Sequence, residues 1–492
     1  MAIFRKIAIA LVALVVIVGG AFWYLARGNP AELSVDDVAG TDPVFQKEKA
    51  ESFPTVQIAE PVGWKAGEAP TPAAGLEVER FAEGLDHPRT LYTLPNGDVL
   101  VSLTRAPKTD DEGEGIMAKI TAWVADRLLT KAGATGPSPN QIVLLRDLDG
   151  NGSAETKQVI LEEGLDSPSG LAWKDGTLYV ANHNALLAFP YTLGSDKVSG
   201  APRKLMDLPP GGGHWMRNIL LSADGSKLYV AVGSSSNIGD NGIKAEEGRA
   251  MIWEYDLAEG RQRQFGVGLR NPNGLDISPW SGELWTTVNE RDMLGGDLVP
   301  DYLTNVPVGA QYGWPWVYYR TNIDRRVKEP MPRFLMEYVR KPEYALGPHV
   351  AALGMVFSKE GDRMGSGFAG GAFIARHGSW NRKPPSGYDV VFVDFDARGN
   401  PVGKPKPVLT GFLKEDGTTR GRPTWVTWGK DGALLVSDDT AGIIWRVRSP
   451  TAAPAAAIAR LEGARLPPRA LKDPRAEFEA DYLREQAGQK IN

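Results

Sequence analysis

The chain has 492 residues, of which 42% are hydrophobic, and its 55 basic and 60 acidic residues give a formal net charge of −5. This near balance gives no sign of a nucleic-acid surface, because such surfaces are strongly basic. The chain has no cysteine, which excludes disulfides, a thiolate nucleophile and zinc sites built from cysteine. We therefore expect a globular protein with a large core and no nucleic-acid partner.

The first predicted element is an uncharged apolar run over residues 7–26, with Arg5 and Lys6 in front and Arg27 behind. A helix of this length spans about 30 Å, enough to cross a bilayer. The basic residues predict a cytoplasmic N-terminus with the remaining chain on the far side. Residues 1–27 are therefore interpreted as a membrane anchor, with a cleaved signal peptide as the alternative. Either way we expect a periplasmic or extracytoplasmic protein, held to the inner membrane if the helix is retained.

The segments that flank the main body have different compositions. Residues 28–75 are rich in Pro, Ala, Glu and Asp and have no sustained period, which predicts a linker with a peripheral segment. Residues 120–133 have apolar residues at helical spacing and predict an inserted helix. Residues 449–492 are interpreted as a C-terminal tail that lies on the surface.

The main body, residues 76–448, contains a recurring hairpin pattern. Each copy has an apolar strand, a tight turn and an alternating second strand, as in GLDHPRTLYTLPNGDVLVS and GRPTWVTWGKDGALLVSDD. The turn pairs tolerate the positive φ that two-residue hairpin turns need. They are Asn96-Gly97, Asp175-Gly176, Asp224-Gly225, Ser281-Gly282 and Asp431-Gly432.

A sixth, degenerate copy is found in VAALGMVFSKE and the following GGAFIARHG. Six copies predict an all-β fold, a six-bladed β-propeller, because closing the array into a ring removes the exposed edge strands. A pair of β-sandwiches or a short solenoid is the alternative. In a propeller, the loops of all blades converge at one end of the central channel, where we expect the chemistry.

Two of the five histidines lie in glycine-flanked segments at such loops, His214 in GGGHWMRN and His377 in ARHGSWNRK. Glycine allows the backbone to approach a bound group closely, and a histidine there can take a proton near neutral pH. The alternative is a structural histidine that is hydrogen-bonded between blades.

Arginines occupy loop positions of several different blades. A ring of guanidinium groups suits a ligand with several carboxylates, because the planar fork binds a carboxylate in bidentate fashion. Surface arginines without a common role are the alternative. The arginines are Arg270, which precedes Asn271, and Arg291, Arg376, Arg382 and Arg422.

Two acidic segments are candidate calcium sites, because calcium prefers oxygen ligands. One is the loop that holds Glu290, Asp292, Asp297 and Asp301. The other is DLDGNGSAE, which resembles the first half of an EF-hand loop but has Gln158 at position twelve. We interpret the second segment as an Asx-rich turn that is at best capable of binding calcium.

Four segments together resemble the soluble quinoprotein sugar dehydrogenases. They are GGGHWMRNILLSADGSKLYVAVG, GLRNPNGLD, the NERD loop with QYGWPW, and GRPTWVTWGKDGALLVSDD. The resemblance covers roughly residues 76–448 and is greatest to the sorbosone dehydrogenase branch. It implies a propeller that binds pyrroloquinoline quinone, a tricarboxylate, with calcium. It also implies oxidation of an aldose-type sugar or a sorbosone-like aldehyde by hydride transfer to the quinone.

The resemblance also implies roles for individual residues. His214 matches the catalytic base. The cofactor contacts implied are Arg270 and Asn271, then Arg376 or His377, and finally Arg422. The loop of Glu290, Arg291 and Asp292 matches the segment that supplies calcium ligands, largely through backbone carbonyls.

Three positions depart from the family pattern. Ser234 replaces the aspartate that supports the base, Thr424 replaces a second arginine, and Arg291-Asp292 replaces Gly-Pro in the calcium loop. These changes bear on cofactor affinity and on the tuning of the base. A calcium-dependent hydrolase or lactonase on the same propeller, and a non-enzymatic binding propeller, are the alternative functions. The particular sugar and the electron acceptor do not follow from the sequence.

Overall fold

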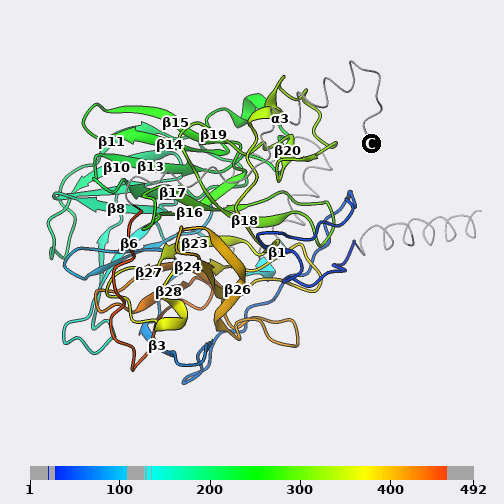
Figure 1. Cartoon of the computed structure of the whole chain (residues 1–492). Coiled ribbons are helices and arrows are strands. Elements are labelled where there is room, and N and C mark those ends of the chain that lie inside the picture. Colours follow the sequence, from blue (N-terminus) through cyan, green and yellow to red (C-terminus); the bar gives the residue numbers. More distant parts are fainter. Residues whose placement is uncertain (1–19, 21–27, 108–126, 128–129, 134–135, 462–492) are drawn as a thin grey trace, which may run out of the picture.

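The computed structural model describes residue 20 and residues 28–107, 127, 130–133 and 136–461 (Figure 1). The predicted anchor or signal segment falls outside these ranges except for residue 20. Of the helix predicted at 120–133, only residues 127 and 130–133 are described, and residues 127, 130 and 131 among them are helical. None of the helices in the described part of the chain is long and apolar enough to cross a membrane.

Six antiparallel sheets form the body of the protein, and each is one blade. The first blade contains β4 (Pro88–Thr93), β5 (Val99–Leu103), β6 (Gln141–Arg146) and β7 (Thr156–Leu161). The second contains β8 (Gly170–Lys174), β9 (Thr177–Ala181), β10 (Ala185–Pro190) and β11 (Arg203–Asp207). The third contains β12 (Ile219–Leu221), β13 (Lys227–Val232), β14 (Met251–Asp256) and β15 (Arg261–Val267), which β19 (Ala310–Gln311) extends.

The fourth blade contains β16 (Asn271–Ile277), β17 (Leu284–Asn289), β18 (Pro300–Asn305) and β22 (Tyr344–Pro348), with β1 (Ala39–Gly40) at its edge. The fifth contains β23 (Ala352–Phe357), β24 (Gly371–Arg376), β25 (Asp389–Phe395) and β26 (Pro401–Thr410), with β2 (Thr71–Pro72) at its edge. The sixth contains β27 (Pro423–Trp428), β28 (Leu434–Asp438), β29 (Ile443–Arg448) and β3 (Glu77–Ala82).

The innermost strands close a ring in the order β4, β8, β12, β16, β23 and β27, and β27 contacts β4 again. Strand β3 pairs with β29, so the start of the propeller completes its last blade. This arrangement confirms the predicted all-β six-bladed propeller. Of the five predicted turns, Asp175-Gly176 is a two-residue hairpin turn with positive φ at both residues, 46° and 80°. The other four predicted turns are longer connections in which only the glycine has positive φ.

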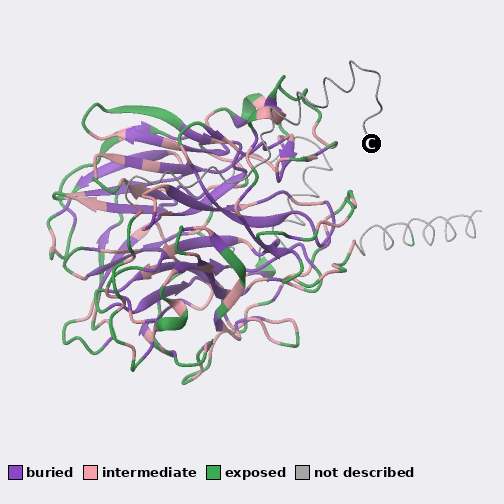
Figure 2. Ribbon diagram, viewed as in Figure 1, coloured by how far each residue is buried: buried purple, intermediate pink, exposed green. Residues whose placement is uncertain are grey.

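The core lies between the blades, where the inner and second strands are mostly buried, whereas outer strands such as β11 and β15 are largely exposed (Figure 2). Glycines in the inner strands allow neighbouring blades to approach closely. A Cβ added at Gly170 would lie 2.5 Å from the Arg217 carbonyl oxygen, and one at Gly274 would lie 2.4 Å from the Leu353 oxygen. A side chain at either position would therefore push two inner strands apart.

Residues 28–75, called the strap below, pack along the propeller and contribute β1 and β2. The amide nitrogen of Glu51 donates to the Met293 oxygen at 3.1 Å, and that of Gln57 donates to the Trp380 oxygen at 2.9 Å. After the last blade, residues 449–461 also lie against the body, where Leu461 donates to the Trp280 oxygen at 2.9 Å. The rest of the predicted tail is outside the described residues.

A long connection, residues 307–341, separates β18 from β22 and is called the insertion. It contains β19, the hairpin of β20 (Val317–Tyr318) and β21 (Asn322–Ile323), and the short helix α3 (Leu335–Tyr338). Two 3-10 turns elsewhere, η1 (Ile243–Glu246) and η2 (Ser366–Phe368), complete the elements.

Candidate active site

The candidate residues lie at one end of the ring of inner strands, called the mouth below. Pairing explains why they meet there: the start of each inner strand lies opposite the end of the second strand of its blade. Asn271 pairs with Asn289, and Pro423 pairs with Asp438. Residues before an inner strand and after a second strand are therefore brought together.

His214 precedes β12 and is oriented by Ser234. Its Nδ1 lies 2.9 Å from the main-chain oxygen of Ser234 and 3.0 Å from the hydroxyl oxygen. A carbonyl oxygen only accepts, so Nδ1 carries the proton and Nε2 is left as an acceptor. Burial, with a further contribution from Arg270, lowers the pKa of His214 to about 3. The imidazole is therefore neutral near pH 7.

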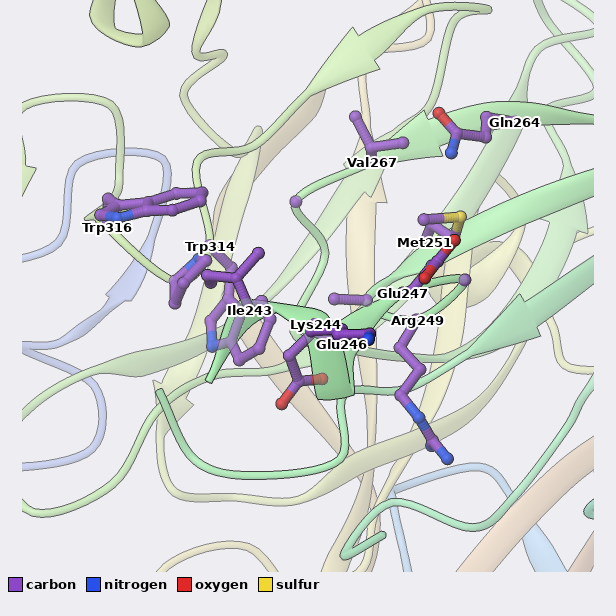
Figure 3. A pocket seen from close by; sticks show the side chains of 14 residues that line it. Ile243, Lys244, Glu246, Glu247, Arg249, Met251, Gln264, Val267, Trp314 and Trp316 are labelled. Atoms are coloured by element: carbon purple, nitrogen blue, oxygen red, sulfur yellow. The ribbon is translucent and has the colours of Figure 1, made fainter. Parts of the chain in front are cut away.

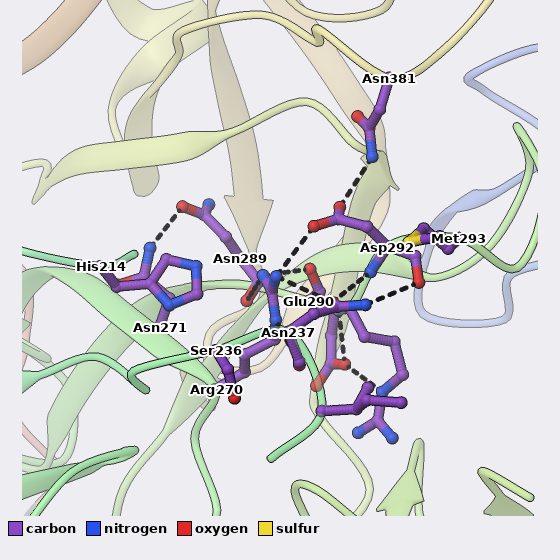
Figure 4. A network of polar contacts seen from close by, with 12 residues as sticks. His214, Ser236, Asn237, Arg270, Asn271, Asn289, Glu290, Asp292, Met293 and Asn381 are labelled. Carbon is purple, nitrogen blue, oxygen red and sulfur yellow. Dashed lines mark hydrogen bonds and ion pairs between the residues drawn. The ribbon is translucent and has the colours of Figure 1, made fainter. Parts of the chain in front are cut away.

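Asn271 lies beside His214 (Figure 4), and Gly233 makes this possible. A Cβ at Gly233 would lie 2.4 Å from Asn271 Oδ1 and 2.6 Å from His214 Cβ. Asn271 Nδ2 donates to Asn289 Oδ1 at 3.0 Å, which fixes the orientation of the amide. The predicted neighbours His214 and Asn271 are thus brought together.

Arg270 directs its donors into the protein. Its Nη1 donates to the Glu290 main-chain oxygen at 2.6 Å, its Nη2 to Asp292 Oδ2 at 2.9 Å, and its Nε to the Asn237 main-chain oxygen at 3.0 Å. Burial would raise the pKa of Asp292, but Arg270 and His349 hold it well below its usual range. Arg270 therefore ties the 290–292 loop to the segment around Asn237, and Figure 4 shows this network.

The side chains of Glu290 and Arg291 face away from the mouth. They form a buried ion pair with 2.9 Å between Arg291 Nε and Glu290 Oε2, and Arg291 Nη1 donates to the Pro315 oxygen at 2.6 Å. Of the predicted calcium loop, only the main chain and the Asp292 side chain are directed toward the site. Asn381 Nδ2 donates to Asp292 Oδ1 at 2.7 Å.

Two main-chain oxygens of this loop converge on one cationic group. Arg326 Nη1 donates to the Asp292 oxygen at 2.8 Å and to the Met293 oxygen at 2.9 Å. Asp297 and Asp301 contribute to the frame of the loop. Asp297 Oδ2 accepts from the Glu32 amide at 2.7 Å, and Asp301, whose pKa burial raises to about 7, accepts from the Glu290 amide at 2.8 Å.

His377 and Arg422 belong to a second group on the far side of the mouth. Arg422 Nε donates to the His377 main-chain oxygen at 3.1 Å, and Nη2 donates to the Gly378 oxygen at 2.8 Å. His377 Nε2 lies 2.9 Å from Asp439 Oδ2. Burial, followed by the nearby Arg422, lowers the pKa of His377 to about 4.

Arg89, which the sequence reasoning missed, joins this group to the His214 loop. Its Nη1 lies 2.5 Å from Asp439 Oδ2 and its Nη2 lies 2.8 Å from Met216 Sδ. Its buried Nε has no partner among the described residues. The repeat contained a signal for Arg89, because Arg89 follows Pro88 in β4 as Thr424 follows Pro423 in β27. The arginine that the family pattern expects at position 424 is therefore found at the equivalent position of the adjacent inner strand.

Two further predicted arginines, Arg376 and Arg382, do not contribute to the mouth. Arg376 is buried between the fourth and fifth blades, where it pairs with Asp389 and donates to the Leu346 oxygen at 2.9 Å. Arg382 is also buried, and its Nε donates to the Gly296 oxygen at 2.9 Å. Neither side chain joins the mouth group, because nearby carboxylates and carbonyls hold it in the protein interior.

The Asx-rich turn between β6 and β7 gathers carboxylate oxygens of Asp147, Asp149 and Glu155 within 4.8 Å of one another. They accept main-chain hydrogen bonds in the turn, including one from Gly150 to Asp147 at 2.7 Å.

A cavity of about 390 Å³ lies next to the site, between η1, β14, β15 and the insertion. Trp314 and Trp316 form one wall, and Met251 and Val267 contribute to the other (Figure 3). Trp314 Nε1 donates to the Asn237 oxygen at 2.9 Å, the same oxygen that accepts from Arg270. Trp314 of the cavity wall and Arg270 of the site are therefore held by the same main-chain oxygen.

Comparisons with known proteins agree with this architecture. A family model described as TrAA12-like matches residues 140–306 and 334–450, more than half of the chain. An uncharacterized protein of Borreliella burgdorferi is 28% identical over 326 residues, which cover 61% of this chain and 84% of that protein. A pyrroloquinoline quinone-dependent pyranose dehydrogenase of Coprinopsis cinerea is 28% identical over 304 residues, 49% of this chain but only 41% of the fungal protein.

Among solved structures, a calcium structure of Trichoderma reesei Carbohydrate-Active Enzymes Family AA12 has a similar fold. Its TM-score is 0.62 at 20% identity, with 80% of this chain and 98% of that chain covered. The match of the family model to both halves of the propeller identifies the chain, which belongs to the TrAA12-like family.

Proposed function

We propose that this protein is a quinoprotein oxidoreductase that oxidises an aldose-type sugar or a sorbosone-like aldehyde, with pyrroloquinoline quinone and calcium as cofactors. The observation that carries the proposal is the placement of His214, neutral and with Nε2 as an acceptor, beside Asn271 at the mouth. Membership of the TrAA12-like family and the similarity to the pyrroloquinoline quinone-dependent pyranose dehydrogenase of Coprinopsis cinerea support it.

The cationic groups at the mouth suit a tricarboxylate. Arg89 and Arg422 come from the adjacent inner strands β4 and β27, and a guanidinium binds a carboxylate well. A buried donor without a partner costs about 1–3 kcal/mol, and the Arg89 Nε is such a donor. A carboxylate placed there would satisfy it, so Arg89 supplies the charge that Thr424 lacks.

His214 is the proposed base. It accepts the proton of the sugar's anomeric hydroxyl at Nε2, while the Ser234 main-chain oxygen holds the ring through Nδ1. The quinone, when bound, supplies the acceptor for the hydride. An anionic ligand nearby stabilises the imidazolium form, so we expect binding to raise the pKa of His214 toward the range in which a base works efficiently.

The calcium site would use main-chain oxygens. The Asp292 and Met293 oxygens converge on Arg326 Nη1, and this guanidinium stands where a hard cation with oxygen ligands would be stabilised. Calcium would therefore replace Arg326 at these two oxygens and polarise a bound carbonyl group. The side chains of Glu290 and Arg291 would hold the loop rather than the metal.

We also propose that the protein acts outside the cytoplasm, anchored to the inner membrane by residues 7–26. The support is the uncharged length of this run and the basic residues in front of it. The electron acceptor that reoxidises the cofactor stays unassigned.

The experiment is a titration of the purified full chain with pyrroloquinoline quinone and calcium, followed by absorbance, and then aldose-dependent reduction of an artificial electron acceptor. A saturable cofactor signal with sugar-dependent turnover is the expected result. Calcium-dependent lactone hydrolysis without a cofactor signal would contradict the proposal in favour of the hydrolase. The absence of both activities and of a cofactor signal would favour a binding propeller.

A further inference from the structure

The insertion is locally basic in an acidic protein. Residues 320–341 contain seven basic and three acidic residues, whereas the whole chain has a net charge of −5. Of the three acidic residues, Asp324 is buried and pairs with Arg291 and Arg326. Arg325, Lys328 and Arg333 are exposed. The outer surface of this segment is therefore positively charged.

Large apolar side chains stand among these basic residues. Phe334 and Tyr338 are 62% and 61% exposed, and Ile323 and Met331 are 43% and 38% exposed. Helix α3 is attached to the protein by Leu335, which packs with Val317 and Val339. Phe334 directly precedes α3 with a left-handed backbone, φ 64°, and Tyr338 is the last residue of α3. Both side chains are exposed although Leu335 gives α3 a packed face.

The strap runs along the insertion and leads to the start of the described body at Gly28. Tyr318 Oη donates to Glu48 Oε1 at 2.7 Å, and the rings of Phe45 and Tyr319 are 4.9 Å apart. In Figure 1, the blue strap lies at the right of the view, below α3 and β20. Asn29, near the start of the strap, donates to Glu51, so the strap begins on the side of the propeller that carries the insertion.

The insertion is also connected to the active site. Its Arg326 donates to the Asp292 and Met293 oxygens. The two stretches that match the family model leave out residues 307–333, so most of the insertion lies outside the matched pattern. The same segment therefore supports the site loop on one side and presents basic and apolar side chains to solvent on the other.

We infer that the exposed surface of the insertion, formed by Ile323, Arg325, Lys328, Met331, Arg333, Phe334 and Tyr338, docks on an anionic phospholipid bilayer. Basic residues are attracted to anionic headgroups, and exposed aromatic and aliphatic side chains enter the interface. The inference builds on the membrane anchor proposed above, which would hold this surface close to the bilayer. Docking would place the mouth beside the membrane.

Site-directed labelling tests the inference sharply, because the chain has no cysteine. Phe334→Cys in the full chain would carry a polarity-sensitive fluorophore, and the protein would be added to phosphatidylcholine vesicles with or without phosphatidylglycerol. Leu148→Cys is the matched control, since Leu148 is 66% exposed in the turn after β6 of the first blade. We expect a blue shift and quenching by a lipid-borne quencher at position 334 in anionic vesicles only, and neither at position 148.

A charge variant separates lipid docking from simple proximity. Arg325→Glu with Arg333→Glu should abolish the spectral shift of the label at 334, whereas Lys197→Glu with Arg203→Glu, on the second blade, should leave it unchanged. If the label remains in water while the protein is bound to the vesicles, docking by the insertion is contradicted but the membrane anchor is not. Protein that remains in the supernatant contradicts both. A shift that appears only when a soluble acidic protein is added would assign the surface to a protein partner and overturn the inference.

Discussion

His214 and Ser234 form a hydrogen-bonded pair in which the main chain of one residue sets the proton position of the other. The imidazole Nδ1 lies 2.9 Å from the Ser234 main-chain oxygen and 3.0 Å from its hydroxyl. The hydroxyl in turn donates to the Ser236 oxygen at 2.7 Å. A serine therefore orients the ring without the negative charge that an aspartate would add.

Replacing the base tests its role. His214→Ala should lower kcat by about 10²- to 10⁴-fold, the typical contribution of a general base. The pyrroloquinoline quinone titration should stay close to that of the unchanged protein, because the carboxylates are expected to contact arginines. Steady-state kinetics and absorbance titration measure both quantities. A loss of less than tenfold with cofactor bound would remove His214 from the mechanism.

The residue behind the base should set the pH dependence. Ser234→Asp places a carboxylate next to Nδ1, which stabilises the imidazolium and raises the pKa of His214. Because the neutral ring is the active form, the acid limb of kcat/KM should move to higher pH. Ser234→Ala keeps the main-chain oxygen and should shift the limb far less. Equal profiles for the two variants would argue against a contact between residue 234 and the base.

Arg89 should contribute to cofactor affinity. A hydrogen bond to a charged group is worth about 1.5–3 kcal/mol, so Arg89→Gln should weaken binding roughly 10- to 100-fold. Arg376→Gln is the control: it breaks the buried pair with Asp389 and should lower the midpoint of thermal unfolding with little change in affinity. Titration of both variants with pyrroloquinoline quinone tests this assignment. Weaker binding by Arg376→Gln and unchanged binding by Arg89→Gln would instead make Arg376 the cofactor contact.

Arg326 should compete with calcium for the Asp292 and Met293 oxygens. Arg326→Gln removes the positive charge from these oxygens, so calcium affinity measured by isothermal calorimetry should increase. The neighbouring exposed change Arg325→Gln should leave the affinity unchanged. A lower affinity in Arg326→Gln would mean that the guanidinium organises the metal loop instead of occupying its place.

His377 should make part of the stability pH-dependent. Burial lowers its pKa to about 4 in the folded protein, while the unfolded chain keeps a value of about 6.5. Between these values the unfolded state binds more protons, so the stability that His377 contributes is complete above pH ~6.5 and falls as the pH drops. The destabilisation caused by His377→Asn, measured by urea unfolding, should therefore be larger at neutral pH than near pH ~4.5. An unchanged difference would indicate that folding does not lower the pKa of His377.

The blade repeat was predictable because its signals are local. Period-two alternation and turn pairs such as Asp175-Gly176 depend on residues close in the chain, and they identified the hairpins. The pairing of β3 with β29 and the packing of the strap were not predictable in this way, because they join segments hundreds of residues apart. The insertion also has no sequence repeat from which its structure could be predicted.

The site was predictable wherever repeat position was sufficient. His214 lies in the loop before β12, and Asn271 starts the adjacent inner strand β16, so their positions in the repeat placed them at the same end of the ring. Arg376 has a similar position, yet Asp389 directly opposite it in β25 draws its guanidinium into the interior. Arg89 was missed because it is tied to the mouth by Asp439 and Met216, which are 350 and 127 residues away in the chain.

The sequence by itself determined the six-bladed propeller, the apolar N-terminal run and His214 as the residue most suited to take a proton. These depend on periodicity, composition and residue chemistry. Only the tertiary structure decided which arginine side chains keep donors for a ligand at the mouth. A guanidinium has five N–H donors, and the carboxylates and carbonyl oxygens that occupy them come from other strands and loops of the same and adjacent blades. Arg270 and Arg376 are committed to such partners, whereas Arg89 keeps a buried donor for a ligand.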